Sequence, residues 1–402
     1  MNFLFAWRYF RSKKSTNAIN IIAWIAITAI AVGTAALIII LSVFNGFEEL
    51  VKGLYGDFYS AIKIVPTQTK TFHISNEQLQ KIKRINNVTA YSLIAEEKAL
   101  LMGNFQTIVT VKGVEPNYNN INNIAKYIKR GKFDLGTQES PAIIMGVGIE
   151  NAAGIDVGRS LTPTILYMPN KSASSFNSTD GLNSYNVIPT GTFVIQQDFD
   201  NKYIFTNLSF LKYMLNMSED EFSAVELNIV GDEKGVKNQL EKILAPSYKI
   251  LSRYEQNQSF YVVMQIEKWV IYGILSLILV VAAFNMIGAL TMLVLEKQKD
   301  IAVLKALGAD ESRIKNIFLL EGLLLAIIGT SVGLLLASTI CWLQSTYHLI
   351  KLGGSTFIIN YYPVKTVLTD YLLVIATVGI IAFGAAWITA RKTSAQTFSL
   401  RS

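Results

Sequence analysis

The segment Glu296–Gly308, with the sequence EKQKDIAVLKALG, decides the fold because it places a cluster of charges between two long apolar runs. The run before it, Val270–Leu295, and the run after it, Gly322–His348, contain no Asp, Glu, Lys or Arg. About 20 apolar residues in a helix cross the ~30 Å hydrocarbon core of a bilayer. The segment is therefore predicted to connect two membrane spans at the membrane surface.

Two further runs without charge, Ala18–Phe44 and Tyr371–Ala390, raise the predicted number of spans to four. Charged residues make up 16% of the chain, whereas a soluble domain carries about 25%. In the third run, Gly329 and Gly333 form a G-x-x-x-G pattern that permits close helix packing, or they occur together by chance. The predicted fold class is a membrane protein with four transmembrane α-helices and a large α+β extracytoplasmic domain inserted between helices 1 and 2.

Basic residues predict the orientation of the spans, because they concentrate on the cytoplasmic side of membrane proteins. Both termini and the connection between the second and third spans are rich in Lys and Arg, whereas the short third-to-fourth loop has only Lys351 and Lys365. Both termini and this connection are thus expected in the cytoplasm, and residues 45–265 outside. The basic residues are Arg8, Arg11, Lys13, Lys14, Lys297, Lys299, Lys305, Arg313, Lys315, Arg391, Lys392 and Arg401.

These patterns divide the chain into four segments. Residues 1–17 are expected to form a cytoplasmic interfacial helix, with a disordered basic tail as the alternative. The next segments are transmembrane helix 1 at 18–44, the extracytoplasmic domain at 45–265 and the remaining membrane part at 266–402. In that last segment, transmembrane helices are predicted at 268–295, 317–346 and 368–390, and a surface helix at 298–308.

The extracytoplasmic segment mixes short strands with amphipathic helices, which is typical of an α+β domain, here with two lobes. Pro169–Ser184 is rich in Ser, Asn and Gly, which predicts a mobile loop. The net charge of +7 arises mainly from the cytoplasmic ends, so nothing favours a nucleic-acid partner. Strands are predicted at Ala61–Val65, Val88–Leu100, Phe105–Val114, Ala142–Met145, Ser160–Tyr167, Val187–Gln196, Tyr203–Asn207 and Ala224–Val230, and helices at Leu208–Leu215 and Lys234–Leu244.

Motifs for enzymatic chemistry are absent from the sequence. There is no phosphate-binding G-x-x-x-x-G-K-[ST], no G-x-S-x-G and no H-E-x-x-H. The two histidines, His73 and His348, are far apart, and the single cysteine, Cys341, lies inside the third apolar run. Glu321 and Asp370 are interpreted as end residues of their spans, which leaves no ionisable group for ion-coupled transport. We therefore predict no catalytic residue, no metal site and an energy source on a partner.

The connection at 296–308 has the periodicity of a short amphipathic helix. Ile301, Leu304 and Gly308 share one stripe, and Gly308 can adopt the left-handed conformation that ends a helix. A helix of about 12 residues is too short to be stable alone, so it gains order by packing on another surface. That surface is either a partner protein or the membrane itself.

Several stretches carry a family resemblance. AAFN at Ala282–Asn285 and LEKQKDIAVLKALGA at Leu295–Ala309, with RYF at Arg8–Phe10 and SVFNGFE at Ser42–Glu48, resemble the permease subunits of bacterial lipoprotein-releasing ABC transporters. These subunits, of the LolC/LolE type, are similar to the wider FtsX-like and MacB-like permease superfamily. Val157-Gly158 resembles part of the MacB-type outer core.

The resemblance implies a permease that works with partners. It implies ABC ATPase subunits, a second permease subunit as homodimer or heterodimer, membrane lipid, a lipoprotein substrate and a periplasmic carrier protein. No cofactor would bind this chain directly, because ATP and Mg would bind the partner ATPase. The implied location is the bacterial inner (cytoplasmic) membrane, with multiple passes and the large domain in the periplasm.

The same resemblance implies roles for individual residues. Some would couple to the ATPase and others would line a substrate path; for the latter, the alternative is that they simply face lipid or pack in the core. The residues implied to couple to the ATPase are Glu296, Lys299, Asp300, Ile301, Leu304, Lys305 and Gly308. The residues implied to line the substrate path are Val43, Phe44, Phe47, Val263, Met264 and Trp269.

The function implied is the ATP-driven extraction of lipoproteins from the outer leaflet of the inner membrane for transfer to the outer membrane. One alternative is a related permease that exports another amphiphile or a peptide. The other is a mechanotransmitter that transports nothing and controls a periplasmic hydrolase through the outer domain. In all three, the chain itself is no enzyme.

Overall fold

The computed structural model describes residues 17–158, 162–169, 182–244, 246–352 and 359–394. Within these residues, four helices are long and apolar enough to cross a membrane: α2 (Asn17–Phe58), α9 (Gln258–Glu296), α11 (Glu311–Tyr347) and α12 (Leu368–Ser394). An α+β domain lies between the first two along the chain. The predicted fold class is confirmed. The interfacial helix predicted for residues 1–17 falls, apart from its last residue, outside the described residues.

The chain forms two compact units, which we call the membrane unit and the outer unit. Among the described residues, the outer unit comprises Val51–Tyr261, and the membrane unit comprises residues 17–50, 262–352 and 359–394. Both boundaries lie inside helices, α2 and α9. The predicted segment 45–265 is therefore longer than the compact outer unit, because residues such as Phe47 pack on other parts of the membrane unit.

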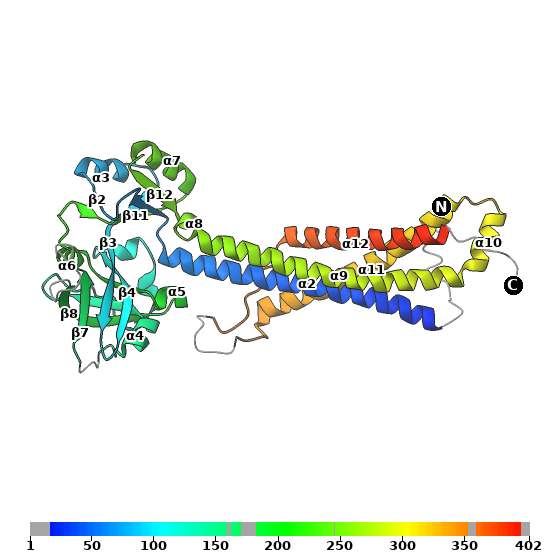
Figure 1. Cartoon of the computed structure of the whole chain (residues 1–402), viewed down its shortest axis with the longest axis horizontal. Coiled ribbons are helices and arrows are strands. Elements are labelled where there is room, and N and C mark those ends of the chain that lie inside the picture. The colour runs from blue at the N-terminus through cyan, green and yellow to red at the C-terminus, as the bar shows by residue number, and fades with distance from the viewer. Residues whose placement is uncertain (1–16, 159–161, 170–181, 245, 353–358, 395–402) are drawn as a thin grey trace. The chain divides into compact units, whose positions relative to one another are not determined.

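The membrane unit is a helical bundle with a core of small and aliphatic side chains. Ala26 and Leu37 of α2 and Ala386 of α12 are fully buried in it. Leu335 and Ile380 are 69% and 74% exposed on the outside of the bundle, as expected for side chains that face lipid. Helix α10 (Gln298–Ala306) joins α9 to α11 at one end of the bundle, as Figure 1 shows.

The outer unit is built on one ten-stranded sheet. Its strands are β1 (Ile62–Pro66), β3 (Val88–Met102), β4 (Gln106–Val114), β5 (Ile128–Gly131), β6 (Ala142–Gly146), β7 (Thr164–Pro169), β8 (Leu182–Phe193), β9 (Tyr203–Asn207), β11 (Ala224–Ile229) and β12 (Tyr248–Ser252). They run in the order β12-β1-β11-β3-β4-β9-β6-β8-β5, with β7 paired to β3 and β8. A separate pair is formed by β2 (Phe72–His73) and β10 (Glu221–Phe222).

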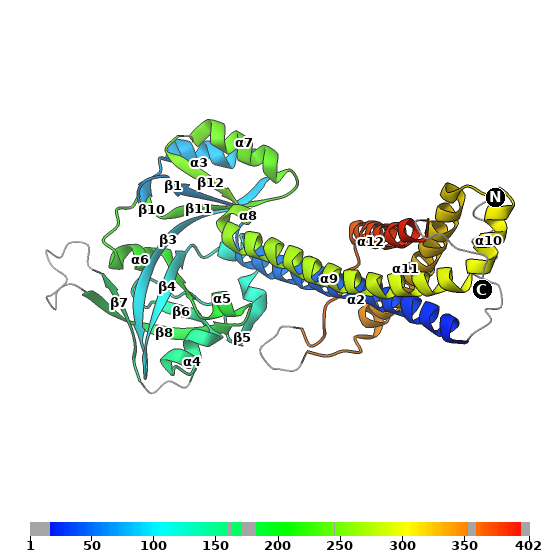
Figure 2. The same ribbon diagram turned by 45° about the vertical axis from the view of Figure 1, so that its right-hand side comes forward.

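Strand β3 joins the two parts of this sheet. Its first half, Val88–Ile94, pairs with β11, and its second half, Ala95–Met102, pairs with β4, both antiparallel. Helices α3 (Asn76–Lys83) and α7 (Glu233–Leu244) lie together beside β1 and β12, as both views show (Figures 1 and 2). The other helices are α4 (Val147–Ala153), α5 (Gln197–Asp200), α6 (Leu208–Met214) and α8 (Arg253–Gln256), with 3₁₀ turns at Tyr118–Asn120 and Ile124–Tyr127.

The loop predicted over Pro169–Ser184 is wrong at both of its ends. Pro169 is the last residue of β7, and Leu182–Ser184 open β8, while residues 170–181 lie outside the described part. The start of β8 reads as a loop because its polar residues belong to an exposed strand. Asn186, four residues into that strand, is exposed, and a polar alternating strand resembles a loop in sequence.

Candidate functional site

Helix α10 is fixed to the membrane unit by one buried side chain. Ile301 is 2% exposed and packs with Leu293 and Val294 of α9 and with Ile314 and Phe318 of α11. Its side chain is therefore not on the surface of the described chain, and its implied role as a contact for an ATPase stays a prediction. Ile301 makes α10 and the adjoining ends of α9 and α11 one packed body.

The exposed apolar side chains of α10 lie on a different face. Val303 and Leu307 are 56% and 80% exposed, and Lys299 is exposed one turn earlier. Their spacing of four residues aligns them along one side of the helix. We call Lys299, Val303 and Leu307 the docking stripe. Leu304, which the sequence placed at the contact, is half-buried beside it.

The charged residues of the connection make short local pairs. Lys297 and Asp300 are 3.2 Å apart, and Lys305 and Glu311 are 3.7 Å apart. Glu296 is the half-buried last residue of α9. Exposed pairs of this kind stabilise a helix by less than about 1 kcal/mol, so they shape the surface of the connection more than its stability.

Gly308 ends the helix as its sequence position predicted. Its φ is +86°, and the backbone N–H groups of Gly308 and Ala309 donate to the carbonyls of Lys305 and Leu304 at 3.0 Å each. This pair of hydrogen bonds is the Schellman motif, which needs a left-handed residue at that position. The turn fixes the direction in which α11 leaves the connection.

At the opposite ends of the spans, three polar side chains from three helices meet. Lys268 of α9 donates to Oδ1 of Asn45 of α2 at 2.8 Å, and Nδ2 of Asn45 donates to Asp370 of α12 at 2.5 Å. The Lys268 ammonium lies 3.6 Å from the same carboxylate. Asn45 and Asp370 are buried, at 5% and 7% exposed. We call these three residues the outer-end cluster.

The residues next to Asn45 explain why the stretch Asn45-Gly46-Phe47 is built as it is. A Cβ on Gly46 would lie 2.4 Å from the carbonyl oxygen of Pro363 and 2.7 Å from the backbone nitrogen of Val364, so only glycine allows this approach. The Phe47 ring meets the edge of Tyr362 at 5.9 Å. The segment before α12 is therefore seated on α2 beside the outer-end cluster.

A cavity of about 130 Å³ adjoins the outer-end cluster. Lys268, Trp269 and Tyr272 of α9 line it together with Leu41 of α2 and Asp370 of α12. Trp269 is 60% exposed and meets Tyr272 edge-on at 5.7 Å. Aromatic and basic side chains in this combination are typical of the membrane–water interface.

The six residues implied for the substrate path are only partly brought together on an accessible surface. Val263 and Trp269 are more than half exposed, and Val43 and Phe44 are half-buried. Met264 is only 7% exposed, so its side chain is buried in this structure, and its place in the path stays a prediction. Phe47 is engaged with Tyr362, as described above.

Glu321 and Asp370 were predicted to be end residues of their spans, and Asp370 lies in the first turn of α12. The structure adds that both carboxylates are buried: Glu321 is 0% exposed within α11, and Asp370 belongs to the outer-end cluster. Burying a carboxylate is costly unless it is paired, and the Asp370 pairing shows how one of them is accommodated.

The glycine pair of α11 brings that helix against α2, as its spacing predicted. A Cβ on Gly329 would lie 2.9 Å from the Ile27 carbonyl oxygen, and a Cβ on Gly333 would lie 2.5 Å from that of Ala31. Both contacts are shorter than any side chain tolerates. The G-x-x-x-G pattern is therefore a packing site and not a chance occurrence.

We expect Gly333→Val to push α11 away from α2 and to lower the yield of folded protein strongly, because the added atoms meet backbone. Overpacking of this kind typically costs about 1–3 kcal/mol or more. Gly384→Val is the matched control, since a Cβ there meets nothing within 4 Å. Size-exclusion chromatography and thermal unfolding in detergent measure both variants. Equal behaviour of the two would contradict the packing role.

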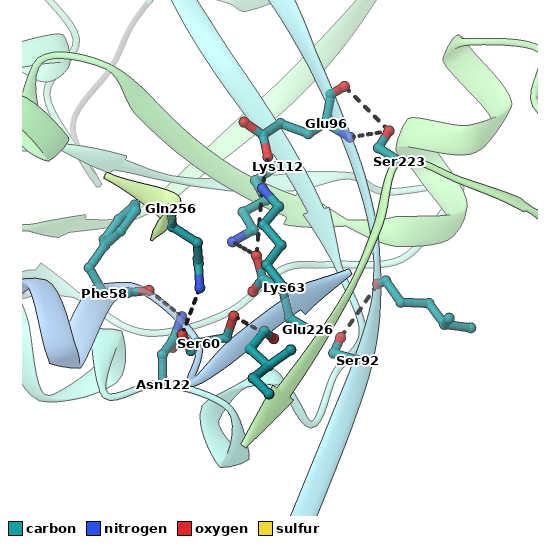
Figure 3. A network of polar contacts seen from close by, with 12 residues as sticks. Phe58, Ser60, Lys63, Ser92, Glu96, Lys112, Asn122, Ser223, Glu226 and Gln256 are labelled. Carbon is teal, nitrogen blue, oxygen red and sulfur yellow. Dashed lines mark hydrogen bonds and ion pairs between the residues drawn. The ribbon is translucent and has the colours of Figure 1, made fainter. Parts of the chain in front are cut away.

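The outer unit contains a second polar site, a buried charge network at the point where β3 changes partners. Lys112 of β4 lies 2.7 Å from Glu226 of β11, with exposed fractions of 3% and 0%. Tyr118 donates to Glu226 at 2.6 Å. Lys63 of β1 lies 2.9 Å from Glu96 of β3, and Figure 3 shows both lysines directed at the two carboxylates.

Burial and charge set the titration of this network. Burial lowers the pKa of Lys112, although Glu226 opposes the shift. For Lys63, burial acts in the same direction, but Glu96 and Glu226 outweigh it and raise its pKa. Burial would raise the pKa of Glu96, yet Lys63 and Lys112 lower it. The network links strands from both parts of the sheet and holds them in one arrangement.

We expect Lys112→Met to destabilise the outer unit by about 3–5 kcal/mol, because it leaves the Glu226 carboxylate buried without its main partner. Lys98→Met, on the exposed side of β3, is the control and should change stability by less than about 0.5 kcal/mol. Lys112→Met combined with Glu226→Met should recover most of the loss. Thermal unfolding followed by circular dichroism measures all three, and a Lys112→Met protein as stable as the control would contradict the assignment.

Comparison with known families agrees with this architecture. Residues 23–243, more than half of the chain, match the MacB-like periplasmic core domain, and residues 272–398 match the FtsX-like permease C-terminal family. The chain belongs to the MacB-like, FtsX-like permease family. The LolC/LolE resemblance read from the sequence is thereby confirmed at the level of the family.

Three relatives illustrate the similarity of this permease. It is 26% identical to the lipoprotein-releasing system transmembrane protein LolC of Xylella fastidiosa over 358 residues, covering 89% of this chain and 85% of that protein. It is 24% identical to LolC of Neisseria meningitidis serogroup B, covering 92% and 91%. It is 26% identical to LolE of Haemophilus influenzae, covering 93% and 92%.

Reasoning from sequence missed the outer-end cluster of the permease, although a signal for it exists. Asn45 directly follows the first apolar run, Lys268 precedes the second by two residues, and Asp370 directly precedes the fourth. All three therefore stand at one level of the membrane on the same side. Polar residues at equal depth in neighbouring helices are candidates for pairing.

Proposed function

We propose that this chain is the permease subunit of an ATP-driven ABC transporter that extracts lipoproteins from the outer leaflet of the inner membrane for transfer to the outer membrane. One observation carries the proposal. Similarity to proteins named for lipoprotein release covers about nine-tenths of both chains, so it includes the outer unit, the spans and α10. Lipoprotein release is thereby favoured over export of another amphiphile.

In this proposal both termini and α10 face the cytoplasm, and the outer unit faces the periplasm. The basic residues around the connection support that orientation. The docking stripe supplies the surface for a separate ATPase, since this chain has no phosphate-binding motif of its own. A second permease subunit completes the transporter complex, and a periplasmic carrier receives the lipoprotein.

The packing of α10 suggests how movement would pass through the membrane. Because Ile301 binds α10 to the ends of α9 and α11, a push on the docking stripe moves both helices together. Helix α9 is unbroken from Gln258 to Glu296, so it can carry that movement along its length. At the far end of α9, the outer-end cluster joins α9 to α2 and α12. Its polar contacts lie beside the predicted substrate path and would break if the three helices moved apart.

Depletion of the protein tests the proposal in cells. We expect lipoproteins destined for the outer membrane to accumulate in the inner membrane, as measured by sucrose-gradient fractionation and immunoblotting. Restoration by the wild-type gene is the control. Normal lipoprotein sorting, with cells that fail to separate and form chains, would instead support the mechanotransmitter that controls a hydrolase.

A further inference from the structure

A charged hollow of about 850 Å³ lies in the outer unit, at the residues by which the chain enters and leaves that unit. Lys52, near the end of α2, and Gln258, the first residue of α9, both line it. Most of the rest of its wall comes from residues 231–237, at and just before the start of α7, and from α8. We call this hollow the entry groove. Its volume is in the range of sites that bind a ligand of drug or short-peptide size.

Two of the carboxylates on the wall of the entry groove are held by the protein itself. Glu255 accepts two hydrogen bonds from Lys237 and one from the Ser252 hydroxyl. Burial would raise the pKa of Glu255, but these bonds outweigh it and lower the pKa to about 2. Asp232 accepts from the backbone N–H of Gly235 at 3.0 Å at the start of α7.

Arg253 is a cation on this wall for which the described residues supply no carboxylate partner. Its Nε atom is buried and has no hydrogen-bond acceptor there, and no carboxylate of the described chain lies within ion-pair distance of it. The guanidinium group rests over Gly56, where a Cβ would lie 3.5 Å from it. Lys234 adds an exposed ammonium group to the same wall.

Aromatic side chains complete the recognition surface. The rings of Tyr254 and Tyr261 lie 4.8 Å apart on the groove wall, and Tyr254 is 48% exposed. Tyr261 is 6% exposed and packs behind the Tyr254 ring. A guanidinium group beside one exposed tyrosine ring favours a ligand that offers both carboxylates and side-chain surface. Arginine in particular binds carboxylates through two parallel hydrogen bonds.

The position of the entry groove along α2 and α9 indicates whether its ligand is a lipid or a polypeptide. Lys52 follows Phe44 by eight residues, and Gln258 precedes Val270 by twelve, so about 12 and 18 Å of helix separate them from the apolar runs. The headgroup layer of a bilayer adds only about 5–8 Å on each side of the hydrocarbon core. A phospholipid seated in the membrane ends short of that level, whereas the polypeptide of an anchored protein continues through it.

We propose that the entry groove binds an acidic segment of the polypeptide of the transported lipoprotein, with Arg253 and Lys234 as the groups that recognise its carboxylates. This inference rests on the proposed function for the identity of the cargo. In this inference, the transporter contacts the polypeptide of the lipoprotein in addition to extracting its lipid anchor. The groove would hold the segment that follows the anchor while the anchor leaves the bilayer.

The experiment uses the full-length protein in membranes with a photoreactive benzoylphenylalanine in place of Gln258, which is exposed in the groove. The probe is a lipoprotein with an acidic linker, compared with the same lipoprotein whose linker carboxylates are changed to amides. We expect irradiation to form an adduct with the acidic linker. The adduct should fall about tenfold with the amide linker and in Arg253→Gln or Lys234→Gln, by loss of one charge-assisted hydrogen bond. Arg84→Gln, exposed elsewhere in the outer unit, should leave it unchanged.

The outcomes separate this inference from the proposed function. Equal adducts with both linkers, an adduct that carries a phospholipid, or no adduct at all would overturn the peptide assignment. A soluble acidic peptide is a second probe, measured by fluorescence anisotropy on the purified full-length protein. Binding that depends on Arg253, in a protein that releases no lipoprotein, would keep the groove as an acidic-peptide site and reject lipoprotein as its cargo.

Discussion

Changing Val303 and Leu307 together to aspartate is expected to separate this permease from its ATPase while leaving its fold intact. Both side chains are more than half exposed on α10 and contact no core. Truncating or charging a central apolar contact in an interface costs at least about 2 kcal/mol each. The double substitution should therefore weaken the association by several hundredfold to about a thousandfold and abolish ATP-driven activity, as measured by co-purification and ATP hydrolysis.

Two controls make that experiment specific. Ser312→Asp adds an acidic residue at an exposed position in the first turn of α11, where negative charge is favourable to the helix, and it should leave the association unchanged. Ile301→Ala should act differently, by opening a cavity in the core and lowering stability by about 2–5 kcal/mol. Undiminished co-purification of the ATPase with the Val303→Asp, Leu307→Asp protein would show that the docking stripe is not the contact.

Replacing Asp370 with alanine is expected to release the outer ends of three helices. The change leaves the Lys268 ammonium and the Asn45 amide without their shared partner in a largely buried site. Removing one partner of a fully buried pair costs about 3–5 kcal/mol. Lys268 is 24% exposed, so we expect about 2–4 kcal/mol, measured as a lowered midpoint of thermal unfolding, together with a loss of ATP-driven release.

A charge reversal distinguishes the pairing from simple packing. In the combined Lys268→Asp, Asp370→Lys protein, the Asn45 amide can turn over and again offer its oxygen to the ammonium and its NH₂ to the carboxylate. We expect this protein to recover much of the lost stability. Glu49→Ala, which breaks an exposed pair with Lys365, is the control and should cost less than about 1 kcal/mol. An Asp370→Ala protein that matches Glu49→Ala would contradict the cluster.

The architecture was predictable because the bilayer imposes a simple rule on sequence. Runs of 20 to 27 residues without charge are long enough to cross the hydrocarbon core as helices, and the structure has a long apolar helix at each of them. The ending of α10 was predictable for a similar reason, since Gly308 is one of few residue types that adopt a left-handed backbone without strain. Local chemistry decided each of these features.

The docking stripe was not predictable from periodicity, because α10 has apolar residues on two faces. Ile301 with Leu304 and Val303 with Leu307 are equally good stripes in a helix of nine residues. Only the packing of Ile301 against α9 and α11 decides which face remains free. The stripe predicted from sequence, Ile301 with Leu304, is the more buried of the two, and only tertiary contacts distinguish it from the exposed stripe.

Long-range pairing accounts for the remaining omissions. Asn45 and Asp370 are separated by 325 positions, and Lys112 and Glu226 by 114. For Asn45 and Asp370, the shared position at the ends of apolar runs suggests a pairing but does not select the partner. For Lys112 and Glu226, each residue alone reads as an ordinary polar position within a strand. The fold brings them together, and burial then makes their pairing costly to break.

The most direct test of the account is the release of a lipoprotein by the purified complex. The permease, with its ATPase and second permease subunit, is reconstituted in liposomes that contain a lipoprotein, and the fraction transferred to a soluble carrier is measured with and without ATP. We predict ATP-dependent release that Val303→Asp with Leu307→Asp abolishes. ATP hydrolysis by the intact complex that leaves every lipoprotein in the liposomes would contradict the account.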